Sequence, residues 1–91
     1  MSEVVRRRVV AHGYVQGVFF RDTTRREAAR RGVAGWVTNR VDGAVEAVFE
    51  GPSDAVTAMV EFCSSGPRGA DVDRVETHEE EPEGLSGFEV R

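Results

Sequence analysis

Hydrophobic and polar positions follow two different periods along the chain, which predicts a mixture of strands and helices. The segment RRRVVAHG (residues 6–13) is rich in β-branched residues and ends at a glycine, as is typical of a strand. RDTTRREAARRG (residues 21–32) predicts a helix, because polar residues suited to capping stand at its start and Gly32 at its end. The apolar face of this helix is thin, so it must lean on its neighbours and on arginine stems for burial.

Two further strands and a hairpin are predicted in the middle of the chain. The strands are GWVTNRV (residues 35–41) and AVEAVFE (residues 44–50), and Asp42–Gly43 between them is a strong signal for a tight turn. In the second strand, three apolar residues share one face and two glutamates lie on the other. The apolar set is Val45, Ala47 and Phe49, and the glutamates are Glu46 and Glu50.

The second predicted helix begins at Pro52 and Ser53 and ends at Gly66. Its apolar residues recur at helical spacing, which indicates a buried stripe and makes its methionine and its cysteine core residues. The stripe consists of Val56, Met59, Val60 and Cys63. Two more strands, DVDRVETHE (residues 71–79) and the short FEVR (residues 88–91), complete the chain.

The order of these elements is strand, helix, strand, strand, helix, strand, followed by the short final strand. This order favours an α+β sandwich of the split βαβ type, with an antiparallel sheet and two helices on one of its faces. The connections are short and no internal repeat is visible. We therefore expect residues 1–91 to form a single domain.

Composition and charge exclude several classes of protein. Hydrophobic residues make up 40% of the 91 residues and charged residues 31%, which is ordinary for a globular protein. The net charge is −4, whereas a general nucleic-acid binder is usually basic. No apolar run approaches the roughly 20 residues of a membrane span, and MSEVVRRRVV lacks the apolar core of a signal peptide. We expect a cytoplasmic monomer that contacts neither membrane nor nucleic acid.

The charges are distributed unevenly along the chain. Nine of the twelve arginines lie in the first half, while acids crowd the end, as in THEEEPEG. This pattern indicates either two solvated faces or a positive field around an anion site. Because there is no lysine and only one cysteine, Schiff-base chemistry and an intrachain disulfide are excluded. No cluster of metal ligands stands out, and we expect no metal and no cofactor.

The segment HGYVQGVFFR (residues 12–21) is the strongest candidate for a site. It leads from a strand through a glycine loop to a helix N-terminus, where unpaired amides and the helix dipole favour anions. Arg21 adds a fork of donors that fits phosphate or carboxylate oxygens. Four apolar side chains could pack around the loop and hold it rigid: Val15, Val18, Phe19 and Phe20. The segment has neither the Walker pattern of nucleoside triphosphate sites nor the pattern of dinucleotide sites. Two interpretations stay open: a binding site for a small anion, or a loop that only connects the strand to the helix.

Two motifs resemble signatures of the acylphosphatase family. GYVQGVFFR (residues 13–21) is similar to the first signature, and GWVTNRVDGAVEAVFEG (residues 35–51) is similar to the second. The resemblance extends over about residues 6–91 and implies a ferredoxin-like βαββαβ sandwich. It also implies hydrolysis of a small acyl phosphate to a carboxylate and inorganic phosphate.

The resemblance further implies roles for individual residues. In the family, loop amides and an arginine bind the phosphate, and an asparagine holds the attacking water. The asparagine corresponds here to Asn39 and the arginine to Arg21. The loop positions correspond to Tyr14, Val15, Gln16, Gly17, Val18, Phe19 and Phe20. Thr38 and Arg31 depart from the residues usual at their positions in the family, but neither departure touches Arg21 or Asn39.

Physical chemistry agrees with these roles. Phosphoryl transfer is catalysed mostly by positioning and charge stabilisation, which an arginine and amides supply without a metal. A neutral asparagine cannot act as a base, but its amide can orient a water molecule, and the phosphate of the substrate can take the proton. His12 is expected to be a strand-face residue, His78 to be solvated, Asp42 to make the turn, and Trp36 to be core or a cover over the site.

Two alternatives are set against this hypothesis. An RNA-recognition domain has the same strand order, but it needs stacking aromatics and a basic surface, whereas residues 44–50 carry glutamates. A related domain that only binds an acyl or carbamoyl phosphate is the second alternative, and the presence of Arg21 and Asn39 favours an enzyme over it. The identity of the natural acyl phosphate stays open at this point.

Overall fold

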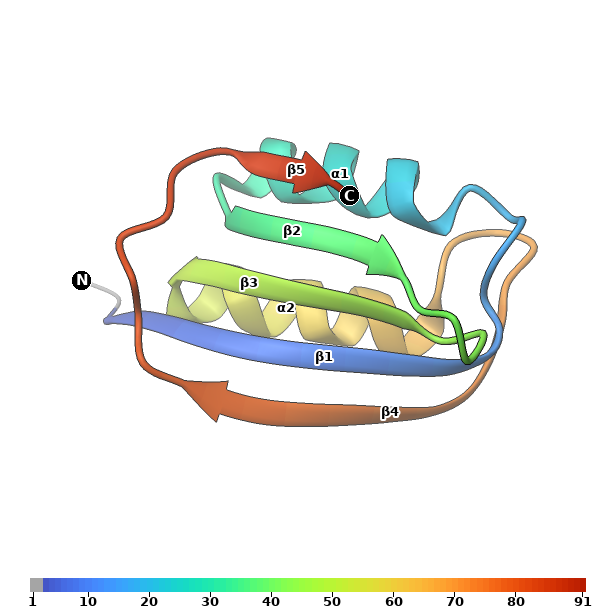
Figure 1. Cartoon of the computed structure of the whole chain (residues 1–91). Coiled ribbons are helices and arrows are strands. Elements are labelled where there is room, and N and C mark those ends of the chain that lie inside the picture. Colours follow the sequence, from blue (N-terminus) through green and yellow to red (C-terminus); the bar gives the residue numbers. More distant parts are fainter. Residues whose placement is uncertain (1–2) are drawn as a thin grey trace.

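The computed structural model describes residues 3–91, which form one five-stranded sheet and two helices (Figure 1). The elements in chain order are β1 (Val4–Tyr14), α1 (Phe20–Arg31), β2 (Ala34–Asn39), β3 (Val45–Pro52), α2 (Ser53–Ser65), β4 (Asp71–Glu80) and β5 (Phe88–Val90). The strand order in the sheet is β4-β1-β3-β2-β5, and both helices pack on the same face. The predicted ferredoxin-like α+β sandwich is therefore confirmed.

The direction of β5 corrects the prediction of a purely antiparallel sheet. β1, β2, β3 and β4 pair antiparallel, but β5 pairs parallel to β2, with Phe88 opposite Gly35. The chain leaves β4 at one edge of the sheet and crosses through residues 81–87 to the other edge (Figure 1). The end at which this connection arrives sets the direction of β5, and a strand of three residues carries no pattern that reveals it.

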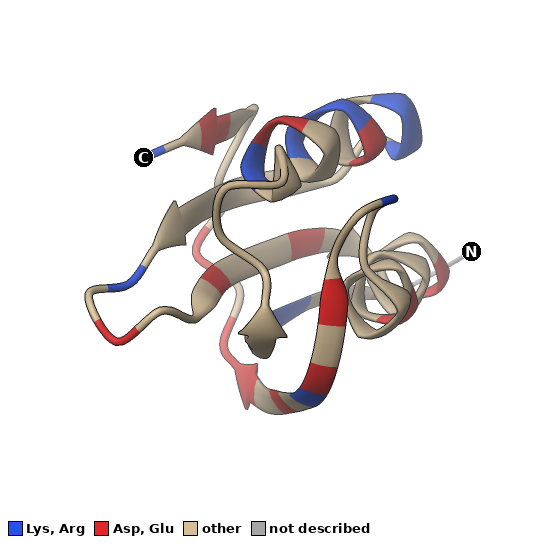
Figure 2. Ribbon diagram, turned by 90° about the vertical axis from the view of Figure 1, so that its right-hand side faces the viewer, with Lys and Arg blue, Asp and Glu red and all other residues tan. Residues whose placement is uncertain are grey.

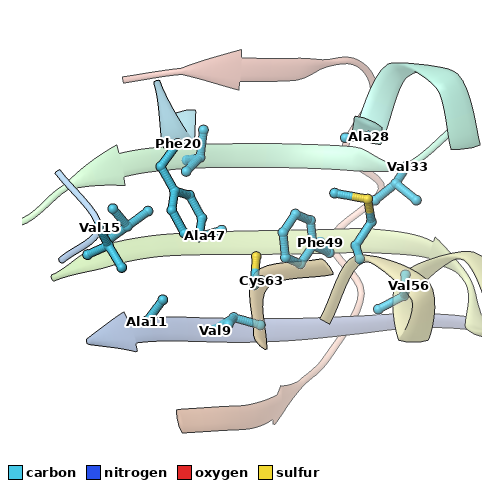
Figure 3. Close-up of a cluster of buried hydrophobic side chains, with 13 residues drawn as sticks. Val9, Ala11, Val15, Phe20, Ala28, Val33, Ala47, Phe49, Val56 and Cys63 are labelled. Carbon is cyan, nitrogen blue, oxygen red and sulfur yellow. The ribbon is translucent and has the colours of Figure 1, made fainter. Parts of the chain in front are cut away.

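The core lies between the sheet and the two helices (Figure 3). The alternation predicted for β3 is confirmed, and on α2 three of the four stripe residues are fully buried while Val60 packs at the edge. Burial raises the pKa of the Cys63 thiol to about 12, so this cysteine is a core residue and no nucleophile. The core residues are Val9, Ala11, Val15, Phe20, Ala28, Val33, Val37, Val45, Ala47, Phe49, Val56, Met59 and Cys63.

The sheet face opposite the helices holds a buried cluster of charges. Arg6 (6% exposed) contacts Glu50 at 3.3 Å and Glu80 at 2.9 Å, and Glu50 is only 4% exposed. The Glu50 carboxylate also accepts three backbone N–H groups, from residues 83, 84 and 85, at 2.8–2.9 Å. Burial works to raise the pKa of Glu50, but these N–H groups and Arg6 outweigh it and hold the pKa below its usual value.

We call this group of Arg6, Glu50, Glu80 and the amides of residues 83–85 the Arg6–Glu50 cluster. It fastens the connection between β4 and β5 to the sheet. Glu50 was predicted on the correct face, but its burial was not predicted, because the residues that cover it come from a distant part of the chain. Neither helix in residues 3–91 has the length and apolar character that crossing a membrane requires.

Candidate active site

The loop between β1 and α1 presents unpaired backbone donors. Gly17 (φ 77°) and Phe19 (φ 57°) both adopt left-handed conformations, which turn successive N–H groups toward one side. Within residues 3–91, no hydrogen bond carries an N–H of residues 16–19 to a protein acceptor. The first helical bond of α1 runs from the Thr23 N–H to the Phe19 carbonyl at 3.0 Å. The N–H groups ahead of it are free to bind a ligand.

The side chains of the loop divide between the core and the solvent. Val15 and Phe20 are buried (0% and 2% exposed) and anchor both ends of the loop, and Val18 packs against the same core. Figure 3 shows Val15 and Phe20 directed toward the core. Phe19 was expected to pack as well, but it is 82% exposed. Its left-handed backbone conformation accounts for this, because it turns the side chain away from the sheet.

Gln16 braces the loop against the hairpin between β2 and β3. Its Nε2 donates to the carbonyls of Arg40 (2.7 Å) and Ala44 (2.9 Å). Asp42 completes the same turn by accepting the Ala44 N–H at 3.1 Å, as predicted. The side chain of Gln16 is therefore occupied by protein contacts, and it couples the loop to the turn that follows Asn39. The sequence motif includes Gln16 but does not reveal this bracing contact.

A cavity of about 490 Å³ lies beside this loop and brings Arg21 and Asn39 together. Arg21 comes from the first turn of α1 and Asn39 from the last residue of β2. The lining residues are Val15, Gly17, Phe19, Phe20, Arg21, Asp22, Arg25, Asn39 and Val90. Tyr14, Gln16 and Val18 were also predicted for the site, but they do not line this cavity.

Three lining residues were not predicted. Asp22 and Arg25 follow Arg21 by one and four positions on α1, so helical spacing alone could have suggested Arg25 as a neighbour of Arg21. Val90 belongs to β5 and reaches the cavity only because β5 pairs with β2. No local sequence signal marks Val90 as a site residue.

Arg21 pairs with no acidic side chain in residues 3–91. Its Nη1 donates to a main-chain oxygen of Arg91 at 3.1 Å, which orients the side chain. Among the arginines of residues 3–91, only Arg21 and Arg68 form no ion pair with an Asp or Glu side chain. Figure 2 shows the other arginines of α1, along the top of the view, interspersed with acidic residues. Arg21 is thus a guanidinium available to an anion in the cavity.

The Asn39 side-chain oxygen has no hydrogen-bond partner within residues 3–91. This oxygen, Oδ1, is enclosed. Buried polar atoms are nearly always hydrogen-bonded, and leaving one unpaired costs about 1–3 kcal/mol. Asn39 therefore brings an unpaired amide oxygen to the cavity that Arg21 also lines, and such an orphaned buried polar atom is a common mark of a functional site.

Asp22 carries the only carboxylate among the lining residues. The hydrogen bond from Arg25, together with the charge of Arg26, holds the pKa of Asp22 below its usual value. Asp22 therefore stays ionised at neutral pH and is a weak base. Within residues 3–91 there is also no group of three or more His, Cys, Asp or Glu side chains placed to hold a metal ion.

Two other candidates lie outside the cavity. His12 faces the open side of the sheet, and its Nε2 hydrogen-bonds to a carboxylate oxygen of Glu76. Trp36 alternates with the buried Val37, so it also faces the open side, where the guanidinium of Arg91 stacks 4.9 Å from the ring centroid. The expectation that Trp36 is core or covers the site is wrong, because strand alternation turns it to the other face.

Comparison with known proteins agrees with this geometry. Residues 7–90 match the family model described as Acylphosphatase. The chain belongs to the acylphosphatase family. The acylphosphatase of Haloarcula marismortui is 57% identical over 86 residues, which cover 94% of each chain. That of Gloeobacter violaceus is 52% identical over 90 residues, covering 99% of this chain and 97% of the other. The structure of an acylphosphatase from Coxiella burnetii is 38% identical, with a TM-score of 0.92 and coverage of 97% and 93%.

The family relationship confirms the resemblance in the sequence motifs. It assigns the chain to the enzymes that hydrolyse acyl phosphates. It also decides against an RNA-recognition domain, which shares only the order of strands and helices.

Proposed function

We propose that the cavity beside α1 hydrolyses small acyl phosphates by attack of water at phosphorus. In this proposal the loop amides and Arg21 hold the phosphate, and Asn39 orients the water. One observation carries the proposal. Within residues 3–91, a guanidinium that pairs with no Asp or Glu side chain and an amide whose oxygen has no protein partner line the same cavity, beside loop N–H groups that have no protein acceptor.

The phosphate would be held by charge-assisted hydrogen bonds. Of residues 14–20, the N–H groups of residues 16–19 have no protein acceptor within residues 3–91, and we assign these to the anion together with the positive end of the α1 dipole. The planar fork of Arg21 binds two phosphate oxygens at once. Each hydrogen bond to a charged group contributes about 1.5–3 kcal/mol. The same donors stabilise the charge that spreads over the equatorial oxygens in the transition state.

Asn39 is proposed to position the nucleophile. Its side-chain amide hydrogen-bonds to the water and so directs an oxygen lone pair of the water toward phosphorus. A P–O bond forms to the water as the P–O bond to the acyl group breaks, and the carboxylate leaves with that electron pair. The proton of the water passes to a phosphoryl oxygen of the substrate and remains on the inorganic phosphate. The carboxylate is a good leaving group, so no side chain has to act as a base or an acid.

We propose that this chemistry needs no metal ion, because Arg21 and the backbone amides supply the positive charge that phosphoryl transfer requires. Every group in the proposed mechanism comes from one chain. A monomer is therefore sufficient for turnover, with a small acyl phosphate as its only partner.

Hydrolysis of benzoyl phosphate in ¹⁸O-labelled water, with EDTA present, tests the proposal. We expect turnover that EDTA does not reduce, with the label in inorganic phosphate, because the site holds the phosphoryl group and not the acyl carbon. A sample without protein gives the background of spontaneous hydrolysis. Label in benzoate would contradict attack at phosphorus. Absence of turnover by folded protein would indicate a binding domain, which phosphate titration of the amide NMR signals of residues 15–20 would then examine.

A further inference from the structure

The cavity is larger than a phosphoryl group requires. Its volume of about 490 Å³ falls within the range of about 300–1,000 Å³ that is typical of sites for whole small molecules. Its lining combines two arginines and one aspartate with apolar side chains from the loop, α1 and β5. Of these two arginines, only Arg21 is assigned to the phosphate in the proposed mechanism. The second arginine, Arg25, has no role in it.

Arg25 lies one helical turn beyond Arg21 on the same side of α1. Four residues along a helix correspond to a rise of about 6 Å, and side chains at this spacing lie on one face. Both residues line the cavity, whereas the neighbouring Arg26 does not. The cavity is therefore lined by two arginines one helical turn apart on the same side of α1.

The ion pair that Arg25 makes is easily exchanged. Its Nη2 lies 3.0 Å from Asp22 Oδ1, while Nη2 of Arg26 lies 3.0 Å from the other oxygen of the same carboxylate. Asp22 therefore keeps a cationic partner when Arg25 turns toward a ligand. The Arg25 and Asp22 side chains are 44% and 48% exposed, and exposed ion pairs contribute little to stability.

We propose that Arg25 binds a second anionic group on the substrate. The site then favours acyl phosphates whose acyl part carries a carboxylate or a further phosphate about one helical turn, or about 6 Å, from the reacting phosphorus. The apolar lining residues contact the hydrocarbon between the two anionic groups. Arg25 is in this sense a specificity-determining residue, and the inference rests on the proposed function.

Two substrates that differ by one carboxylate test this inference: benzoyl phosphate and 3-carboxybenzoyl phosphate. The meta position keeps the added carboxylate away from its own acyl carbon, so the substrate cannot cyclise. The quantity measured is the ratio of kcat/KM for the carboxylated substrate to that for benzoyl phosphate. A ratio cancels any general effect of a mutation on catalysis or on the fraction of active protein.

Arg25→Gln is expected to lower this ratio by about 5- to 10-fold, which is the effect expected from the loss of one partly exposed, charge-assisted hydrogen bond. Arg25→Lys keeps the charge and should give a ratio between those of the wild type and Arg25→Gln. Arg26→Gln is the matched control, because Arg26 also pairs with Asp22 but lies outside the cavity lining. Its ratio should equal that of the wild type.

A ratio that Arg25→Gln leaves unchanged would overturn the inference, and so would an equal fall in Arg26→Gln, which would indicate a general effect of the α1 charges. If the wild type hydrolyses benzoyl phosphate but the ratio does not respond to Arg25, only this inference fails. If the wild type hydrolyses neither substrate, the proposed function fails and this inference fails with it.

Discussion

Arg6 and Arg21 lie near opposite ends of β1 and have opposite electrostatic surroundings. Arg6 is buried among Glu50, Glu80 and Glu83, at N–O distances of 2.9–3.6 Å. Arg21 lines an open cavity, and within residues 3–91 it pairs with no Asp or Glu side chain but donates to a main-chain oxygen of Arg91. The comparison shows that the surroundings decide what an arginine does. An arginine enclosed by several acidic side chains holds the fold together, whereas an arginine at a cavity without an acidic side-chain partner keeps donors for a substrate.

The two regions also differ in whether their other polar side chains have hydrogen-bond partners. In the Arg6–Glu50 cluster, the Glu50 carboxylate accepts three backbone N–H groups in addition to its ion pair. At the cavity, the Asn39 Oδ1 has no hydrogen-bond partner in the part of the chain that the structure describes. One region is saturated with internal hydrogen bonds and the other leaves donors and acceptors free. We therefore expect mutations in the cavity to reduce activity and mutations in the cluster to reduce stability.

The largest effect is expected from Arg21→Gln. It removes the only cation assigned to the phosphate, so kcat/KM for benzoyl phosphate should fall by at least about 10²–10³-fold, as for loss of a donor that stabilises transition-state charge. Arg68→Gln is the matched control, since Arg68 also lacks an ion pair but does not line the cavity. Steady-state kinetics of both proteins, with circular dichroism to verify folding, make the comparison. Near-wild-type turnover in Arg21→Gln would remove Arg21 from the mechanism.

Asn39→Ala should lower kcat by about 10²-fold or more while changing KM little, because the proposed contact is to water and to no atom of the substrate. Its stability should not decrease by more than about 1 kcal/mol, since the buried Oδ1 makes no hydrogen bond that would be lost. Thr38→Ala, which alters the neighbouring residue on β2, is the control. A rise in KM with unchanged kcat would indicate that Asn39 binds substrate instead.

Glu50→Gln should show the reverse behaviour. Removing one partner of a buried ion pair leaves Arg6 poorly compensated, and we expect a loss of about 2–4 kcal/mol in the free energy of unfolding. Glu46→Gln is the matched control on the same strand. Glu46 is less buried and pairs only with Arg8, at 3.4 Å, so its loss should be below about 1 kcal/mol. Urea denaturation measures both, and equal losses would contradict a special role for the cluster.

The smallest effect expected is on the pH dependence of stability. The folded-state pKa values of Glu50 and Glu80 are held below the usual glutamate value of 4.5. Such groups stabilise the fold fully above the unfolded-state pKa, and the stabilisation is lost as the pH falls through the lower folded-state pKa. Wild-type protein should therefore lose stability below about pH 4.5 more steeply than Glu50→Gln does. Urea midpoints between pH 7 and pH 3 would show this, and parallel curves would refute it.

Much of the fold could be predicted because its signals are local. The periodicity of β3 and α2, the Asp42–Gly43 turn and the glycine at the end of α1 are each readable within a few residues, and the structure agrees with them. Two features that were missed depend on contacts between distant segments. The burial of Glu50 depends on residues 80–85, and the parallel direction of β5 depends on the path of the connection before it.

The candidate site shows the same division. Arg21 and Asn39 were predicted from their motifs, and the structure brings both to one cavity. The bracing by Gln16, the outward turn of Phe19 and the position of Val90 were not predicted. Each depends on a backbone conformation or on a strand pairing that the motif does not contain.

The sequence by itself determined the family, the order of helices and strands, and the two polar residues that the proposed chemistry needs, because motifs and periodicity are carried by neighbouring positions. Only the tertiary structure decided which charges are neutralised. Within residues 3–91, ten of the twelve arginines pair with Asp or Glu side chains, whereas Arg21 pairs with none and lines the cavity with Asn39. The physical reason is that an ion pair forms over a few ångströms in space, and segments far apart in the chain supply its partners.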